Sequence, residues 1–492
     1  MPRRSVLAVD LGAESGRAVL GVFRDGRFDL REIHRFANAP LPLFGRLHWD
    51  VYALFDGIKT ALSRCAAEGA AVAGIAVDAW GVDFGLLAED GSLLGLPFAY
   101  RDPRNVAAMN DFLSHVPRSR VYEQTGIQFL PFNSLFQLHA LRQENAALLR
   151  AADRFLMIPD LMTYFLTGTK VNEATIASTS QLIDPRRRDW SSELVEALDL
   201  PASLFGRPCE PGRVVGSLLP ALAAETGLPE IPVIATAGHD TAAAVAGVPA
   251  AEGRWAYLSS GTWSLLGVEI PAPVITADAE RLNFTNEGGV SGTTRLLKNV
   301  TGLWLIQRCR ERWRGERAWS YDELKRAALD APPFAAFIDP DAPEFLNPAD
   351  MPETIRAFCR ATGQKPPDSP AAIVRCVLES LALKYRTVLD ELRLVSPVAI
   401  DRLHIIGGGS RNEVLNRFTA DAIRLPVVAG PAEATALGNC MVQALALGWA
   451  RSLSDMRASH AAEPGLDRVE PGDVEAWDRA YARFQDVLRR RP

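Results

Sequence analysis

The sequence has few cysteines, and no spacing pattern links them. Its six cysteines are scattered over 492 residues, and none belongs to a CxxC pair. No Cys/His cluster has the spacing of zinc ligands, so we expect no structural zinc site. Scattered, unpaired thiols are typical of a reducing compartment, and we therefore expect a cytoplasmic protein.

Other absences exclude further classes of protein. The formal net charge is −6 and no run of more than three basic residues occurs, which argues against a nucleic-acid partner. No apolar stretch approaches the ~20 residues that span a bilayer, and the run Val6–Val9 is too short for a signal peptide, so we expect no membrane association. The absence of GK[ST] argues against a P-loop ATPase, and the absence of GxSxG argues against a hydrolase nucleophile elbow.

Apolar strand candidates alternate with segments of helical periodicity along the whole chain. The strands are expected at 72–77, 231–237 and 403–406, and examples of the helices are 133–150 and 432–447. Such alternation predicts α/β domains.

One hairpin pattern occurs twice. Leu7–Phe23 and Trp255–Ile270 each consist of an apolar strand, a polar turn that contains glycine, and a second apolar strand. Related hairpins at two distant points predict two domains of similar build, and the chain is long enough for both. We expect an N-terminal domain at 1–248 and a C-terminal domain at 249–492.

The turn of the first hairpin has residues that suit phosphate. It reads DLGAESGR from Asp10 to Arg17. Its glycines permit close approach of a ligand, while the turn amides and the Ser15 hydroxyl can point at phosphate oxygens. Asp10 could hold Mg²⁺. An ordinary hairpin turn explains the same residues, and for this turn alone that interpretation is favoured.

A polar loop with two carboxylates follows the strand at 72–77. It reads DAWGVD from Asp78 to Asp83, with Trp80 and Gly81 between the acids. Carboxylates accept hydrogen bonds from a polyol, and an aromatic face can cover the sugar carbons. Aspartates that bond to nearby backbone amides are an equally good explanation.

A carboxylate also follows the strand at 231–237. The segment Gly238–Thr241 reads GHDT, and a helix begins there. Ligands of open α/β sheets bind outside the carboxyl ends of the strands, where Asp240 could take a proton from an attacking hydroxyl. From this motif alone, the favoured interpretation is Asp240 as the N-cap of the helix, and His239 could be a buried core histidine.

Two further turns suit a nucleotide. Ser259–Ser264, SSGTWS, forms the turn of the second hairpin, and Gly407–Gly409 lies between a strand and a helix. Amides at a helix N-terminus are available to phosphate oxygens. A Ser/Thr-rich turn and a tight entry into a helix are the structural alternatives.

Together these motifs resemble the FGGY carbohydrate kinases of the actin, hexokinase and 70-kDa heat-shock ATPase superfamily. Within the family, the chain most resembles the members that act on L-rhamnulose. LSSGTWSL followed by TNEGG and KNVTGLW is the specific part of this resemblance, because other members differ there. The matching stretches occur in order from about residue 6 to 445 and are VDLGAESGR, DAWGVDF, FQLHAL, MIPDLMTYFLTG, ATIASTSQL, GHDTA, YLSSGTWSL, TNEGG, LLKNVTGLWLIQR, GGGSRN and GPAEATALGN.

The resemblance implies two ribonuclease H-like domains that face each other across a catalytic cleft. It implies that the sugar binds mainly to the N-terminal domain and ATP mainly to the C-terminal one. The expected reaction transfers phosphate from ATP to the 1-hydroxyl of L-rhamnulose. Alternatives are a kinase for L-fuculose or another ketose, and a non-catalytic ATP-binding sensor of the actin type. A monomer and a homodimer both remain open.

The resemblance also assigns residues to roles. It implies that Asp240 is the general base and, from the wider superfamily, that Asp10 binds Mg²⁺. The residues expected to bind sugar, including those of the DAWGVD loop, are Asp78, Trp80, Gly81, Asp83, His239, Thr241 and Asn299. The residues expected to bind ATP are Ala13, Glu14, Ser15, Gly16, Arg17, Thr262, Gln307 and Gly408.

Two positions depart from the family pattern. Glu14 stands where a small hydroxyl residue is more usual, and its carboxylate would repel phosphate unless it points away or meets Mg²⁺. Some members carry a cysteine pair that can form a disulfide, but the corresponding segment here, 418–423, contains no cysteine.

Overall fold

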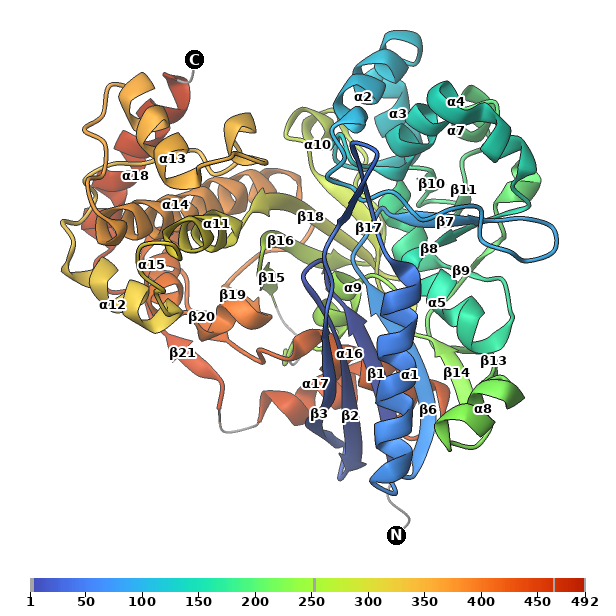
Figure 1. The fold of residues 1–492 in the computed structure, drawn as a ribbon. Helices are drawn as coiled ribbons and strands as arrows, with labels where there is room; N and C mark the ends of the chain where they lie inside the picture. The colour runs from blue at the N-terminus through green and yellow to red at the C-terminus, as the bar shows by residue number, and fades with distance from the viewer. Residues whose placement is uncertain (1–3, 251–253, 463–464, 491–492) are drawn as a thin grey trace. The chain divides into compact units, whose positions relative to one another are not determined.

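The computed structural model describes residues 4–250, 254–462 and 465–490, and the chain divides into two compact units (Figure 1). Unit 1 comprises residues 1–251, 269–296 and 434–462, and unit 2 comprises residues 252–268, 297–433 and 463–492. Each unit is therefore assembled from separate stretches of the chain. A sequence boundary between residues 248 and 249 stays a prediction.

Unit 1 contains the first hairpin and the strands that follow it. Its strands are β1 (Arg4–Leu11), β2 (Ser15–Arg24), β3 (Arg27–Ala37), β4 (Leu41–Leu43), β5 (Arg46–His48), β6 (Val72–Ala79), β7 (Phe84–Leu87), β8 (Arg154–Met157), β9 (Asn172–Glu173), β10 (Ile183–Asp184), β11 (Asp189–Trp190), β12 (Pro208–Cys209), β13 (Arg213–Ser217), β14 (Pro232–Ala235) and β17 (Thr285–Gly288). Its helices are α1 (Val51–Ala67), α2 (Arg104–His115), α3 (Arg118–Thr125), α4 (Ser134–Ala151), α5 (Ile158–Thr167), α6 (Ala174–Ala177), α7 (Ser192–Ala197), α8 (Pro220–Thr226), α9 (Asp240–Ala246), α10 (Ala277–Arg281), α16 (Ala434–Ala446) and α17 (Leu453–Ala461).

The main sheet of unit 1 has the strand order β13-β14-β6-β1-β2-β3. The predicted hairpin is confirmed, because β1 and β2 pair antiparallel, with Asp10 opposite Arg17. Strands β6 and β14 run parallel to β1, so their carboxyl ends lie at the same edge of the sheet.

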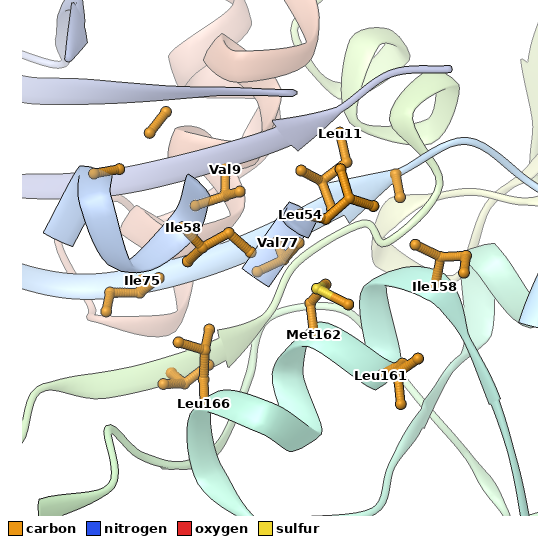
Figure 2. Packing of buried hydrophobic residues seen from close by; sticks show 14 of the residues in the cluster. Val9, Leu11, Leu54, Ile58, Ile75, Val77, Ile158, Leu161, Met162 and Leu166 are labelled. Atoms are coloured by element: carbon orange, nitrogen blue, oxygen red, sulfur yellow. The ribbon is translucent and has the colours of Figure 1, made fainter. Parts of the chain in front are cut away.

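The two faces of this sheet are covered by different helices. Val9 and Leu11 on β1 belong to a buried cluster with residues of α1 and α5, including Ile58 and Met162, which Figure 2 shows in close packing. The alternate residue Ala8 packs into a second cluster, with α9 and α16. Side chains alternate across a strand, so Asp10 continues the set that faces α9 and α16.

Helices α9 and α16 cross at glycines. A Cβ atom on Gly438 would lie 1.8 Å from the carbonyl oxygen of Ala243, and one on Gly247 would lie 2.4 Å from that of Ala434. Only glycine permits backbones to approach this closely. The crossing fixes α9, whose first residue is Asp240, against the helix that carries Asn439.

Unit 2 repeats the arrangement of a hairpin followed by parallel strands. Its strands are β15 (Trp255–Ser260), most of β16 (Trp263–Ile270) and of β18 (Thr294–Thr301), β19 (Arg402–Ile406), β20 (Val427–Ala429) and β21 (Asp467–Val469), in the order β18-β16-β15-β19-β20-β21. Its helices are α11 (Trp304–Trp313), α12 (Tyr321–Asp330), α13 (Met351–Ala361), α14 (Pro370–Val395), α15 (Glu413–Ile423) and α18 (Val474–Arg489), and η5 (Gly408–Arg411) is a short 3₁₀ helix. Strands β15 and β16 form the second predicted hairpin, and β19 pairs parallel with β15.

The six cysteines all lie in the described part of the chain, and all are buried free thiols. Within that part, no helix has both the length and the apolar character needed to cross a bilayer.

Candidate active site

Three aspartates gather where the parallel strands of unit 1 end. Asp10 lies opposite Asp78 in the register of β1 and β6. The backbone N–H of Ala79 donates to the carbonyl of Gly238 at 2.9 Å, which joins the end of β6 to the segment before Asp240. The sequence predicted Asp78 in a loop, but it lies inside β6, because β6 continues alongside β1 to Ala79.

Arg17 neutralises Asp10. Its Nε and Nη2 both donate to Oδ2 of Asp10, at 2.9 and 2.7 Å. The two side chains are 16% and 10% exposed, so the pair is mostly shielded from solvent. The antiparallel register of β1 and β2 creates this contact.

Asp78 is fully buried and contacts α16. Asn439 donates to its Oδ2 at 2.6 Å, while its Oδ1 has no hydrogen-bond partner among the described residues. Burial raises the pKa of Asp78 well above its ordinary value, and the charges of Asp10 and Asp240 raise it further. Gln443 in turn donates to Oδ1 of Asn439 at 2.8 Å, which fixes the amide.

Asp240 is the first residue of α9 and does not cap the helix. His239 occupies the N-cap position, and its side chain makes no capping hydrogen bond. The Thr241 hydroxyl donates to Oδ1 of Asp240 at 3.0 Å, and the aspartate side chain remains 32% exposed. Burial raises the pKa of Asp240; His239 lowers it, and the charge of Asp10 raises it further, so the net shift is upward. The Asp240 carboxylate is thus partly exposed, and its raised pKa favours uptake of a proton.

Glu173 holds the segment that precedes Asp240, a role that no sequence motif predicted. Its Oε2 accepts from the backbone N–H of Gly238 at 2.9 Å, and its carboxylate also accepts from Thr175. The Thr175 hydroxyl accepts from the backbone N–H of His239 at 3.2 Å. The only signal in the sequence was that Thr175 falls in the stretch ATIASTSQL, beside Glu173.

In the DAWGVD loop, Asp83 supports the aromatic residues. Its Oδ2 accepts from the indole N–H groups of Trp49 and Trp80 and from the backbone N–H of Tyr100. Its Oδ1 accepts from Gln137 at 2.8 Å. Burial raises its pKa to about 6, against these hydrogen bonds. A direct contact of Asp83 with sugar stays a prediction.

The loop is strained immediately after Gly81. Val82 has φ of 70°, a left-handed conformation that a β-branched residue rarely adopts. Thr179 accepts from its backbone N–H at 3.0 Å, and Ser134 donates to its carbonyl at 2.6 Å. A Cβ atom on Gly81 would lie 3.1 Å from Thr179, so the backbone there is also closely packed. Such over-determined strain is typical of binding loops.

The turn between β1 and β2 is held by Asn38. Its side chain donates to the carbonyl of Gly12 at 2.8 Å, and its backbone N–H donates to that of Glu14 at 3.1 Å. A Cβ atom on Gly16 would lie 2.3 Å from the ring of Phe36, so packing explains this glycine. Glu14 is exposed. Ala13 and Ser15 are half-buried in the same turn.

Unit 2 brings together two residues predicted to bind ATP. Gln307 on α11 donates to the hydroxyl of Thr262 at 3.3 Å. The backbone N–H of Gly302 donates to the carbonyl of Thr262 at 3.1 Å, so the turns SSGTWS and KNVTGLW pack on each other. Asn299, predicted to bind sugar, lies on β18 in this unit and is half-buried.

The three glycines after β19 differ in how much room each has for a side chain. Gly407 has φ of 82° and a Cβ atom there would lie 3.0 Å from the carbonyl oxygen of Ser260. A Cβ atom on Gly409 would lie 2.1 Å from the Ser260 hydroxyl and 2.8 Å from the Ser260 carbonyl oxygen. No atom of the described residues lies within 4 Å of a Cβ atom on Gly408. Packing therefore accounts for Gly407 and Gly409 but not for Gly408.

The chain matches two family models over most of its length. The model of the FGGY family of carbohydrate kinases, N-terminal domain, matches residues 5–247, and that of the C-terminal domain matches residues 256–447. The chain belongs to the FGGY family of carbohydrate kinases. This confirms the predicted family and the prediction that the protein is a sugar kinase.

Individual relatives cover the whole chain. A rhamnulokinase of Bacteroides thetaiotaomicron is 52% identical over 487 residues, which are 99% of this chain and 100% of the relative. One of Pectobacterium carotovorum is 43% identical over 488 residues, 99% of this chain and 97% of the relative. The crystal structure of a ligand-bound xylulose kinase from Lactobacillus acidophilus has a TM-score of 0.82 at 15% identity, with 99% of this chain and 98% of that chain covered. This likeness confirms the predicted two-domain α/β fold.

Replacement of Gly408 and of Gly409 by alanine tests which of the two glycines the packing requires. We expect Gly409→Ala to lower the melting temperature, because the added Cβ must displace the Ser260 backbone, and overpacking of this kind costs about 1–3 kcal/mol. Gly408→Ala should leave the melting temperature almost unchanged. Thermal unfolding of both variants beside the parent tests this. Equal destabilisation by the two substitutions would contradict the difference in packing.

Proposed function

We propose that the protein phosphorylates L-rhamnulose at its 1-hydroxyl with ATP and produces L-rhamnulose 1-phosphate. The relatives that are 52% and 43% identical along the full chain are both rhamnulokinases, which supports this substrate. The proposed chemistry rests on Asp240. Its carboxylate is partly exposed, has a raised pKa and lies beyond the ends of the parallel strands. Phosphoryl transfer to an alcohol needs a base at such a position.

In the proposed reaction, Asp240 accepts the proton of the sugar 1-hydroxyl as the oxygen attacks the γ-phosphorus. The bond from the γ-phosphorus to the bridging oxygen breaks, and ADP leaves with that electron pair. Thr241 donates to Oδ1 of Asp240 and so limits the rotation of the carboxylate. Glu173 holds the backbone just before Asp240, which keeps the base in place between turnovers.

The sugar is proposed to bind against the DAWGVD loop and the segment from His239 to Thr241. Gly81 would supply backbone groups, and Trp80 an apolar edge, with Asn299 of β18 as a further contact. Asp78 and Asp83 are buried, so we assign them a positioning part: Asp83 holds Trp80, and Asp78 ties the end of β6 to Asn439.

ATP is proposed to contact the first hairpin turn, from Ala13 to Arg17, and three residues of unit 2. Of those three, Thr262 and Gln307 already bond to each other, and Gly408 has open space beside its Cα. Arg17 could exchange Asp10 for a phosphate oxygen, because a guanidinium binds either anion. We further propose that the protein works in the cytoplasm, where its six buried thiols would stay reduced.

The residues around Asp10 fit a magnesium ion carried in with the nucleotide. The described residues contain no group of three His, Cys, Asp or Glu side chains that could enclose a metal. Mg²⁺ commonly takes only one or two protein carboxylates and completes its shell with phosphates and water. The charge of Asp10 raises the pKa of both Asp78 and Asp240, so a cation beside Asp10 would relieve this repulsion. When bound, Mg²⁺ would neutralise phosphate charge.

A panel of sugars tests the substrate. Purified protein with ATP and Mg²⁺ should release ADP fastest with L-rhamnulose, more slowly with L-fuculose, and least with D-xylulose and glycerol, at equal concentrations. Formation of the 1-phosphate is checked by phosphorus NMR. A higher kcat/KM for L-fuculose would reject the proposed sugar, and ATP binding without sugar-stimulated ADP release would reject the kinase.

Replacement of the base tests the proposed mechanism. Asp240→Asn removes the proton acceptor but keeps the shape, so we expect kcat to fall by about 10²–10⁴-fold while the sugar still binds. Asp29→Asn is the control, because Asp29 is an exposed carboxylate on β3. The kinetics are read by ADP release and the binding by calorimetry. Near-normal turnover of Asp240→Asn would show that another group is the base.

A further inference from the structure

A buried ion pair lies behind His239. Arg295, at the start of β18, is fully buried, and the Glu287 side chain, on β17, is 6% exposed. Nη2 of Arg295 lies 3.0 Å from Oε2 of Glu287, and Nε of Arg295 donates to the carbonyl of Gly288 at 2.9 Å. All these residues, including His239, belong to unit 1. No sequence motif predicted a role for either member of the pair.

Arg295 and Glu287 both lie close to the same ring nitrogen of His239, Nδ1. Nη2 of Arg295 lies 3.0 Å from Nδ1 of His239, and Oε2 of Glu287 lies 3.2 Å from it. The other ring nitrogen, Nε2, lies 3.4 Å from Oδ1 of Asp240. His239 is therefore placed between a buried ion pair and the proposed base.

This arrangement gives Nδ1 a neighbour of suitable charge in either protonation state of the ring. A neutral ring with its proton on Nε2 accepts at Nδ1 from Arg295. A charged ring would bring its Nδ1–H to Oε2 of Glu287, which lies 3.2 Å away and has no hydrogen-bond partner among the described residues. In both states, Nε2 carries a hydrogen that faces Asp240. The neutral ring with its proton on Nδ1 would instead turn a lone pair of Nε2 toward the carboxylate, which is unfavourable.

If Arg295 and Glu287 served only to stabilise the fold, they would not need to contact His239. Burying two charges costs more than apolar packing of the same volume unless their hydrogen bonds are well satisfied. Here Nη1 of Arg295 has no hydrogen-bond partner among the described residues. The pair is thus incompletely satisfied as a structural element, although its contacts converge on a residue next to the proposed base.

We infer that Arg295 and Glu287 are positioning residues that hold the His239 ring with its Nε2–H toward Asp240. This inference rests on the proposed function for its catalytic consequence. An Nε2–H directed at Oδ1 of Asp240, 3.4 Å away, attracts that carboxylate oxygen and leaves the other for the proton of the sugar hydroxyl. The buried pair thereby controls the orientation of the base without touching the substrate.

Nitrogen NMR of the ring tests the inference without any substrate. The protein is labelled with ¹⁵N-histidine, and the His239 signals are identified by their loss in His239→Gln. We expect a hydrogen on Nε2 at every pH at which the protein is folded. A neutral ring with its hydrogen on Nδ1 in the parent protein would overturn the inference. This measurement stands even if the sugar panel fails.

A double substitution removes the pair without leaving a lone buried charge. In Arg295→Met combined with Glu287→Leu, we expect a mixture of the two neutral forms of the His239 ring. We also expect kcat to fall roughly 10-fold, within the range of coupled neighbours. If His239 transmits the effect, the same double substitution should cause no further loss of kcat in a His239→Gln protein. A full additional loss there, or an unchanged ring signal, would overturn the inference.

A second buried pair in unit 1 supplies the matched control. Nη1 of Arg457 lies 2.7 Å from Oε2 of Glu269, and the two side chains are 10% and 11% exposed. Arg457 also donates to the backbone carbonyls of Val245 and Ala246. Arg457→Met combined with Glu269→Leu should leave the His239 signals and kcat unchanged, whatever it does to the melting temperature. A change of the His239 signals as large as that of the first double substitution would assign the effect to general loosening and overturn the inference.

Discussion

The parallel pairing of β1 with β6 is the constraint on which the candidate site depends. It places Asp10 opposite Asp78, and the hydrogen bond from Ala79 to Gly238 extends the alignment to the segment before Asp240. Asp10 lies on β1, Asp78 on β6, and Asp240 at the start of α9, the helix that follows β14. A shift of the register by one residue would turn Asp10 to the opposite face of the sheet, toward the cluster with α1 and α5.

Bringing three acids to one sheet edge is electrostatically costly, and each is stabilised differently. Arg17 pairs with Asp10, and Asn439 supports the buried Asp78. Asp240 alone keeps about a third of its side chain exposed. The first two therefore serve the site through fixed contacts, whereas Asp240 remains available for proton transfer.

Much of this could be predicted from sequence where the signal is local. Alternating apolar residues around a glycine turn predicted both hairpins, and strand-end motifs identified Asp10 and Asp240. Contacts between distant segments left no such signal: Asn439 reaches Asp78 across 361 positions, and Glu173 reaches Gly238 across 65. The same limit applies to Asp78, whose place inside β6 depends on pairing with β1. It also applies to Gly409, where Ser260 leaves no room for a side chain.

The pH dependence of kcat/KM for the sugar, at saturating ATP and Mg²⁺, tests most directly whether Asp240 is the base. A base works only when deprotonated, and burial together with Asp10 raises the pKa of Asp240. Activity should therefore fall toward acid with an apparent pKa above the ~4 of an ordinary aspartate. Because His239 lowers the pKa of Asp240, His239→Gln should move that acid limb to higher pH, and Asp29→Asn should not. A profile that stays flat down to pH ~4, or an acid limb that His239→Gln leaves in place, would contradict the account.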